Sequence, residues 1–181
     1  MDQTFLNTTI VTIFIALLGY LATYFNNLRL SQRKDKLERI NKQLSDLYGP
    51  MFSLTQASSI AWKGFRTLHR PNRPFYFEGN VLPEEDLKAW RLWMSTVFMP
   101  INIKLYDLLL SKSDLLIETT MPECLLLFCA HVAAYQAVLE KWRNNDFSEH
   151  VSVINYPNEI ENYAQASYAK LKAQQATLLG K

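Results

Sequence analysis

The hydrophobic pattern divides the chain into one long apolar segment followed by a series of amphipathic segments. Residues 8–25 (TTIVTIFIALLGYLATYF) are predominantly apolar, and no charged residue lies between Asp2 and Arg29. A helix of this length reaches about 27 Å, close to the roughly 30 Å hydrocarbon core of a bilayer. The pattern predicts a transmembrane anchor over residues 1–28. A cleaved signal peptide is the alternative, but it requires a basic start and a small-residue cleavage site, which this segment does not have.

Small and polar residues recur within the apolar segment at steps of three or four, so they share one face of the helix. Such a face lets two backbones approach closely, or it lines a water-filled lumen inside an assembly. A single span that merely tolerates small residues is the plainer interpretation. The residues of this small-residue stripe, which we expect to line a pore or an oligomer interface, are Thr8, Thr12, Ala16, Gly19, Thr23, Asn26 and Asn27.

The segment after the apolar stretch is strongly basic, with six Lys or Arg against two acidic residues over positions 29–42. Because basic loops stay on the cytoplasmic side, we expect a single-pass protein of a bacterial inner membrane, with the N-terminus outside and everything downstream inside. Leu30, Leu37 and Leu44 are spaced by seven, as are Ile40 and Leu47. This spacing predicts a juxtamembrane helix over residues 29–50 that packs against another helix or a second copy.

Prolines and acidic residues mark the boundaries of the remaining elements. Pro50 and Pro100 cannot continue helical hydrogen bonding, so we expect a kink or a short turn at Pro50, and a kink or the end of a helix at Pro100. Helix starts are indicated where a proline precedes acidic residues, which favour the positive end of the helix dipole. The signals predict helices over about 51–68, 83–99, 101–110, 122–143 and 157–179, with a loop over 69–81 and a weak strand signal at 150–156. We therefore expect an all-α protein, in which residues 51–181 form a cytoplasmic helical bundle.

A second uncharged apolar stretch covers residues 124–139. It is too short to span a membrane, and it carries His131 and Gln136 between flanking glutamates. We expect it to be the central helix of the bundle, with His131 as a hydrogen-bonded core residue.

Composition excludes several classes of site. The five glycines are scattered, which excludes a glycine-rich phosphate loop. Cys124 and Cys129 have neither metal-clip nor redox-motif spacing, and the three histidines lack metal-ligand spacing. We therefore expect no metal and no cofactor.

Residues 143–150 (RNNDFSEH) form a motif with a candidate chemistry. An Arg beside a scissile phosphate neutralises developing charge, and a His moves the proton of a ribose 2′-hydroxyl, which together give metal-independent RNA cleavage. Arg143, Asn144 and His150 resemble the R-x(4–6)-H motif of HEPN domains, four-helix RNA-cleaving or RNA-binding modules in which Asn often follows the Arg. A capped loop with an exposed Arg and His is the alternative.

The anchor and the motif together resemble a narrower family. An N-terminal span followed by a small helical domain with a divergent HEPN motif is similar to the membrane accessory protein encoded beside the RNA-guided RNA nuclease of type VI-B CRISPR systems. That family forms ring-shaped membrane pores that enhance antiphage defence and depolarise the membrane. The resemblance implies a homo-oligomeric pore in a lipid bilayer, a HEPN-like bundle, and RNA or an RNA-guided nuclease as a further partner. Because Asp146 and Glu149 would repel an RNA backbone, we expect a structural or RNA-sensing role for Arg143 and His150 rather than a catalytic one.

Two alternatives to the pore remain. The first is a membrane-tethered, metal-independent HEPN-type ribonuclease that works as a dimer. The second is a non-catalytic anchor that recruits a cytoplasmic partner through its bundle, by way of the basic stretch 63–73 or the acidic helix start at Glu84.

Overall fold

A computed structural model describes residues 3–71, 76–77 and 82–180, with the side chains of Asn7 and of the described residues from Ile10 onward. Throughout these ranges the regular structure is helical, without a strand. The predicted all-α class is confirmed, and the weak strand signal at 150–156 corresponds to irregular chain. The predicted loop over 69–81 lies mostly outside the described residues, which omit 72–75 and 78–81.

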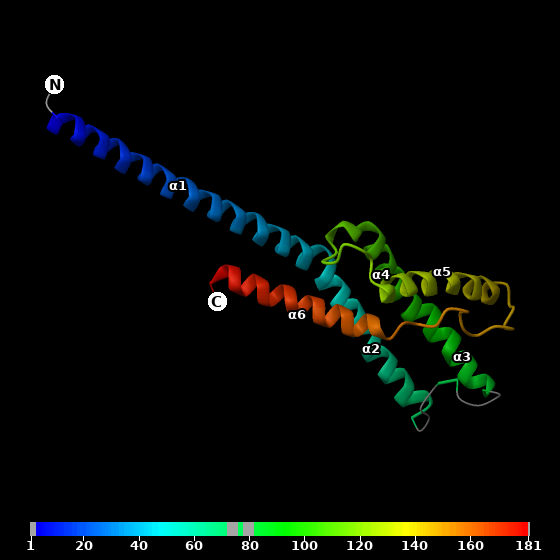
Figure 1. Cartoon of the computed structure of the whole chain (residues 1–181). Coiled ribbons are helices and arrows are strands. Elements are labelled where there is room, and N and C mark those ends of the chain that lie inside the picture. Colours follow the sequence, from blue (N-terminus) through cyan, green and yellow to red (C-terminus); the bar gives the residue numbers. More distant parts are fainter. Residues whose placement is uncertain (1–2, 72–75, 78–81, 181) are drawn as a thin grey trace.

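The first part of the chain is one unbroken run of helix that contains a π-helical turn. Helix α1 covers Gln3–Gln43, the π turn η1 covers Leu44–Tyr48, and α2 covers Gly49–His69. Pro50 has no N–H to donate, and the helix accommodates it by a wider bond just before it, from the N–H of Gly49 to the carbonyl of Leu44. The helix changes direction here (Figure 1). A kink therefore forms at Pro50, and the short turn offered as its alternative does not.

A second π turn repeats this arrangement. Helix α3 covers Glu84–Trp93, η2 covers Met94–Phe98 and α4 covers Met99–Ser111, so Pro100 again follows a π turn without ending the helix. The segments around the two turns, LSDLYGPM and MSTVFMPI, match in residue type at all positions except Asp46/Thr96 and Gly49/Met99. This short repeat was not anticipated from the sequence.

The remaining elements close the bundle. A 3-10 turn, η3, covers Ser113–Leu115, α5 covers Glu123–Arg143 and α6 covers Glu159–Leu179, so the predicted starts of both long helices are confirmed. Helix α2 contacts α4 and α6, and α5 contacts the same two helices. An aromatic cluster packs α2 against α3 and η2; its rings belong to Trp62, Phe65, Tyr76, Trp90 and Phe98.

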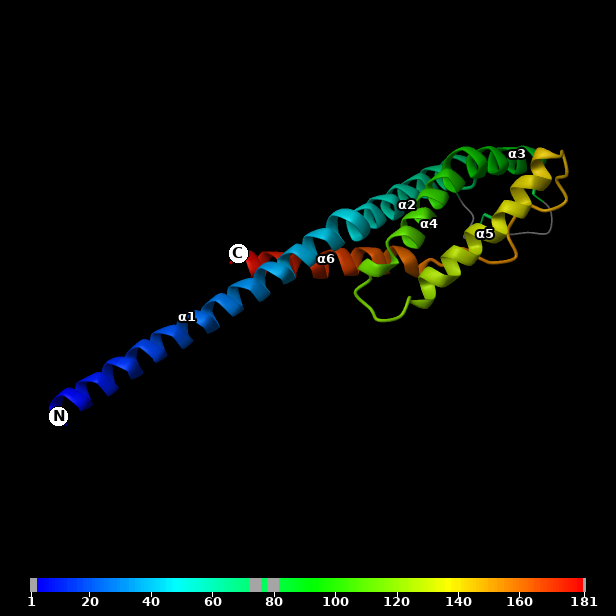
Figure 2. The same ribbon diagram turned by 90° about the horizontal axis from the view of Figure 1, so that it is seen from above.

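Helix α6 runs back alongside the second half of α1 (Figures 1 and 2). The predicted hydrophobic seam faces it: Leu37 is half-buried, and Ile40, Leu44 and Leu47 are buried, whereas Leu30 is exposed. The seam therefore packs against another helix of the same chain.

Two helices are long and apolar enough to cross a membrane by length and composition. The first lies in the run Ile10–His69, and none of its apolar 18-residue window is buried. The second is α5, with 39% of its window buried. Helix α5 contacts α4 and α6 and carries eight buried residues, and its exposed apolar residues include Leu126, Leu127, Ala130, Ala133 and Ala137. Its predicted central position in the bundle stays a prediction.

Candidate functional site

The small-residue stripe of α1 lies on the part of the helix that extends beyond the bundle (Figure 2). Thr8 belongs to α1, but its side chain lies outside the described residues. The hydroxyl of Thr23 donates to the carbonyl of Gly19 at 2.9 Å, so it is satisfied within its own helix. A Cβ added at Gly19 would meet nothing within 4 Å. The stripe residues whose side chains are described are all exposed: Thr12, Ala16, Gly19, Thr23, Asn26 and Asn27.

The motif loop begins at the end of α5. Arg143 is exposed and forms an ion pair with Glu140 of the preceding turn at 2.8 Å. The amide of Asn144 donates to the carbonyl of Glu140 at 3.0 Å, which caps the helix. The chain then turns through Asn145, whose φ of 61° lies in the left-handed region that Asn tolerates better than most residues.

Three aromatic side chains hold the far end of this loop. The carbonyl of His150 accepts hydrogen bonds from the indole N–H of Trp90 at 2.6 Å and from the hydroxyl of Tyr135 at 2.9 Å. The indole of Trp142 donates to the carbonyl of Glu149 at 2.8 Å. These anchors were missed in the sequence analysis, because a side chain that binds a backbone carbonyl leaves no spacing signal in the sequence.

Arg143 and His150 have different partners within the chain. The imidazole of His150 is half-buried and lies near Arg91 and Glu84 of α3, and burial followed by the charge of Arg91 lowers its pKa. Among the described residues, no hydrogen bond or ion pair joins Arg143 to His150. An RNA-directed role for Arg143, Asn144 and His150 stays a prediction.

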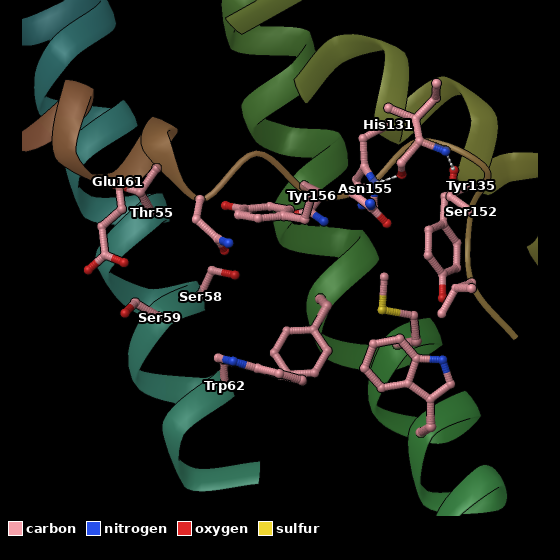
Figure 3. A pocket seen from close by; sticks show the side chains of 17 residues that line it. Thr55, Ser58, Ser59, Trp62, His131, Tyr135, Ser152, Asn155, Tyr156 and Glu161 are labelled. Atoms are coloured by element: carbon pink, nitrogen blue, oxygen red, sulfur yellow. Dashed lines mark hydrogen bonds between the residues drawn. The ribbon is translucent and has the colours of Figure 1, made fainter. Parts of the chain in front are cut away.

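A cavity of about 260 Å³ opens between α2, η2, α5 and the irregular segment 151–158. Figure 3 shows Ser58, Ser59 and Trp62 on the α2 side and His131 on the α5 side, with the ring of Tyr156 extending between them. Further rings of the wall belong to Trp90, Phe98 and Tyr135. The cavity combines aromatic walls with a few polar groups, which is the usual composition of a small-molecule site.

Two buried polar side chains of the cavity wall are incompletely paired. Asn102 is 3% exposed and His131 is 5% exposed. The Nδ1 of His131 lies 2.7 Å from the carbonyl of Ile154, and burial lowers the pKa of its imidazole. A neutral ring that donates from Nδ1 carries an acceptor at Nε2. Within the described part of the chain, neither this Nε2 nor the Oδ1 of Asn102 has a hydrogen-bond partner. The predicted hydrogen bond of His131 is present, but the role of its second nitrogen was missed.

No group of three or more His, Cys, Asp or Glu side chains that could hold a metal ion occurs among the described residues. Comparison of the chain with models of protein families, with curated proteins and with solved structures finds no match.

Proposed function

We propose that this chain is a single-span membrane protein that assembles with copies of itself through α1 and forms a pore, with its bundle on the cytoplasmic side. The observation that carries the proposal is the exposed apolar half of α1, which projects beyond the bundle (Figure 1) and has no buried residue in its apolar window. An exposed apolar surface of this length is costly in water and favourable in a bilayer.

The dimensions of α1 fit this role. Its 41 residues correspond to roughly 60 Å of helix, about twice the hydrocarbon thickness of a bilayer. One half can therefore cross the membrane, and the other half carries the basic residues 29–42 and lies beside α6. Basic residues at this place favour a cytoplasmic bundle and contact with anionic headgroups.

The small-residue stripe supports self-association. Helices in a bilayer gain little from the hydrophobic effect, so they associate where small side chains let their backbones come close. Gly19 has open space around its Cα, and the hydroxyl of Thr23 is already satisfied within the helix. The positions of Gly19 and Thr23 are therefore open to close contact with a second copy. A role in antiphage defence is supported by the resemblance of architecture and motif alone.

The experiment replaces the centre of the stripe by leucine in a triple variant, Thr12→Leu, Gly19→Leu and Thr23→Leu. Bulky side chains on this face should prevent close helix contact. Expression of the wild type in bacteria should depolarise the inner membrane, and the variant should lose this effect. Ring-shaped particles in mild detergent should be lost with it.

The matched control changes the opposite face of the same helix, with Ile10→Leu and Phe14→Leu. This variant should depolarise the membrane as the wild type does, and resistance to alkaline extraction should show that all three proteins are inserted. Depolarisation that persists in the inserted triple variant would exclude a pore lined or closed by this stripe.

A further inference from the structure

The membrane function proposed above does not use the cavity between α2, η2 and α5. We propose that this cavity binds a small organic cation that presents N–H donors, such as an amidinium, a guanidinium or a primary ammonium compound. The proposal concerns the bundle alone and holds whether or not α1 forms a pore.

Three donors of the wall are already engaged, and the two buried atoms of the wall that have no partner are acceptors. The hydroxyl of Thr55 donates to the carbonyl of Met51 at 3.0 Å, and Trp90 and Tyr135 both donate to the carbonyl of His150. The atoms without a partner in the described chain are the Nε2 of His131 and the Oδ1 of Asn102, and both accept hydrogen bonds. A buried acceptor without a donor is costly, so the wall favours a ligand that brings N–H groups.

The charge of the cavity favours a cation. Glu161 contributes a carboxylate to the lining, and no Lys or Arg occurs among the described lining residues. The imidazole of His131 adds no opposing charge at neutral pH, because burial lowers its pKa. An anionic ligand would be repelled by Glu161 and would find no cationic partner, whereas a cation is attracted.

The aromatic walls suit the same ligand. The rings of Trp62, Trp90, Tyr135 and Tyr156 line the cavity, and the faces of such rings attract cations, most strongly when water is excluded.

The size limits the ligand to a small molecule. A volume of about 260 Å³ is just below the range of roughly 300–1,000 Å³ for drug-sized ligands. We therefore expect a ligand of about the size of a single substituted ring or a short diamine. The exposed side chains of Asn155 and Asn158 belong to the lining and mark an entrance from solvent.

The test uses three probes of one shape and different charge, which are benzamidinium, benzamide and benzoate. Calorimetric titration of the full chain in a non-ionic detergent should show one site for benzamidinium. Benzamide keeps N–H donors but lacks the charge, and its affinity should be about tenfold lower. Benzoate, an acceptor-only anion, should not bind. Equal or tighter binding of benzoate, or no binding of any probe, would overturn the proposal.

Variants identify the atoms involved. His131→Asn retains a donor for the carbonyl of Ile154 but removes the Nε2 acceptor, and Asn102→Leu removes the Oδ1 acceptor; each should weaken benzamidinium binding by roughly tenfold. The matched control is His69→Asn, since His69 also has a buried unpartnered Nε2 but does not line the cavity. Benzamidinium should bind this control as it binds the wild type. An equal loss in the control, or full affinity in both cavity variants, would contradict the assignment. If circular dichroism shows that one cavity variant does not fold, the other variant and the wild-type titrations with the three probes test the proposal.

Discussion

Burial controls the protonation of the two histidines that lie on the α5 side of the bundle. The pKa of His131 is lowered mainly by burial, and that of His150 by burial and by the charge of Arg91. The tyrosines beside His131 do not titrate at physiological pH, because burial raises the pKa of Tyr135 and raises that of Tyr156 to about 12. Mild acid therefore changes the charge of this region by protonating the imidazoles of His131 and His150.

The bundle should lose stability on mild acidification. His131 has an ordinary pKa of 6.5 in the unfolded chain and a lower pKa in the folded chain. Between these two pKa values the unfolded chain binds more protons than the folded chain. The contribution of neutral His131 to the free energy of unfolding is therefore complete above about pH 6.5 and is lost as the pH falls through the pKa of the folded chain. The melting temperature of the full chain in detergent should fall between about pH 7.5 and pH 5. His131→Asn should show a smaller fall, and an unchanged pH dependence in this variant would assign the effect to other groups.

At the scale of elements, the π turn before α2 imposes a local steric demand. A Cβ added at Gly49 would lie 2.5 Å from the carbonyl oxygen of Leu44, too close without a backbone shift. Met99 occupies the equivalent place in η2, where its ψ is −37° rather than the −55° of Gly49, so the two turns are not identical. The glycine therefore fits the particular geometry of η1.

Two alanine substitutions in α2 should have opposite effects. Gly49→Ala should lower the free energy of unfolding by about 1–3 kcal/mol, because the new methyl group forces the backbone to move. Gly64→Ala should raise it by about 0.5–1 kcal/mol, because a Cβ there meets nothing within 4 Å and alanine favours the helix. Denaturant titration followed by circular dichroism measures both. A neutral effect of Gly49→Ala would show that η1 relaxes to the geometry of η2.

Helix starts were predictable from the sequence, because their signals are local. Pro122-Glu123 marked the start of α5 and Pro157-Asn158-Glu159 that of α6, and both starts are confirmed. The π turns were not predictable, since Pro50 and Pro100 show only that ordinary helical bonding is interrupted. The cavity was also not predictable from the sequence, because Asn102 and His131 lie on different helices and only tertiary packing brings them to one wall.

At the scale of the molecule, α6 holds the C-terminal half of α1 in place. The guanidinium of Arg33 donates twice to the carbonyl of Leu178, with an Nε–oxygen distance of 2.8 Å. The amide of Gln175 donates to the side-chain oxygen of Asn41 at 2.7 Å. The last carbonyls of a helix lack intrahelical partners, so a basic side chain at this place both satisfies one and favours the dipole.

Removing this contact should loosen the end of α6. In Arg33→Leu, hydrogen exchange over residues 172–179 should become faster, while exchange in α5 should stay unchanged, since α5 lies toward the other end of α6 (Figure 1). Arg39→Leu removes an exposed charge from the same helix, so it is the matched control and should leave exchange in α6 as in the wild type. Equal acceleration in both variants would attribute the effect to net charge rather than to the contact.

The unbroken helix from Gln3 to His69 is bent at the π turn Leu44–Tyr48. On one side of the bend lies the exposed apolar half of α1. On the other side, α2 carries the wall of the cavity from Thr55 to Trp62. A helix tilts when its apolar length exceeds the thickness of the bilayer around it. Because the helix is continuous through this described run, the proposed insertion of α1 in a membrane predicts that a change in membrane thickness that tilts α1 moves the α2 wall of the cavity relative to α5, and that a ligand bound in the cavity opposes this movement.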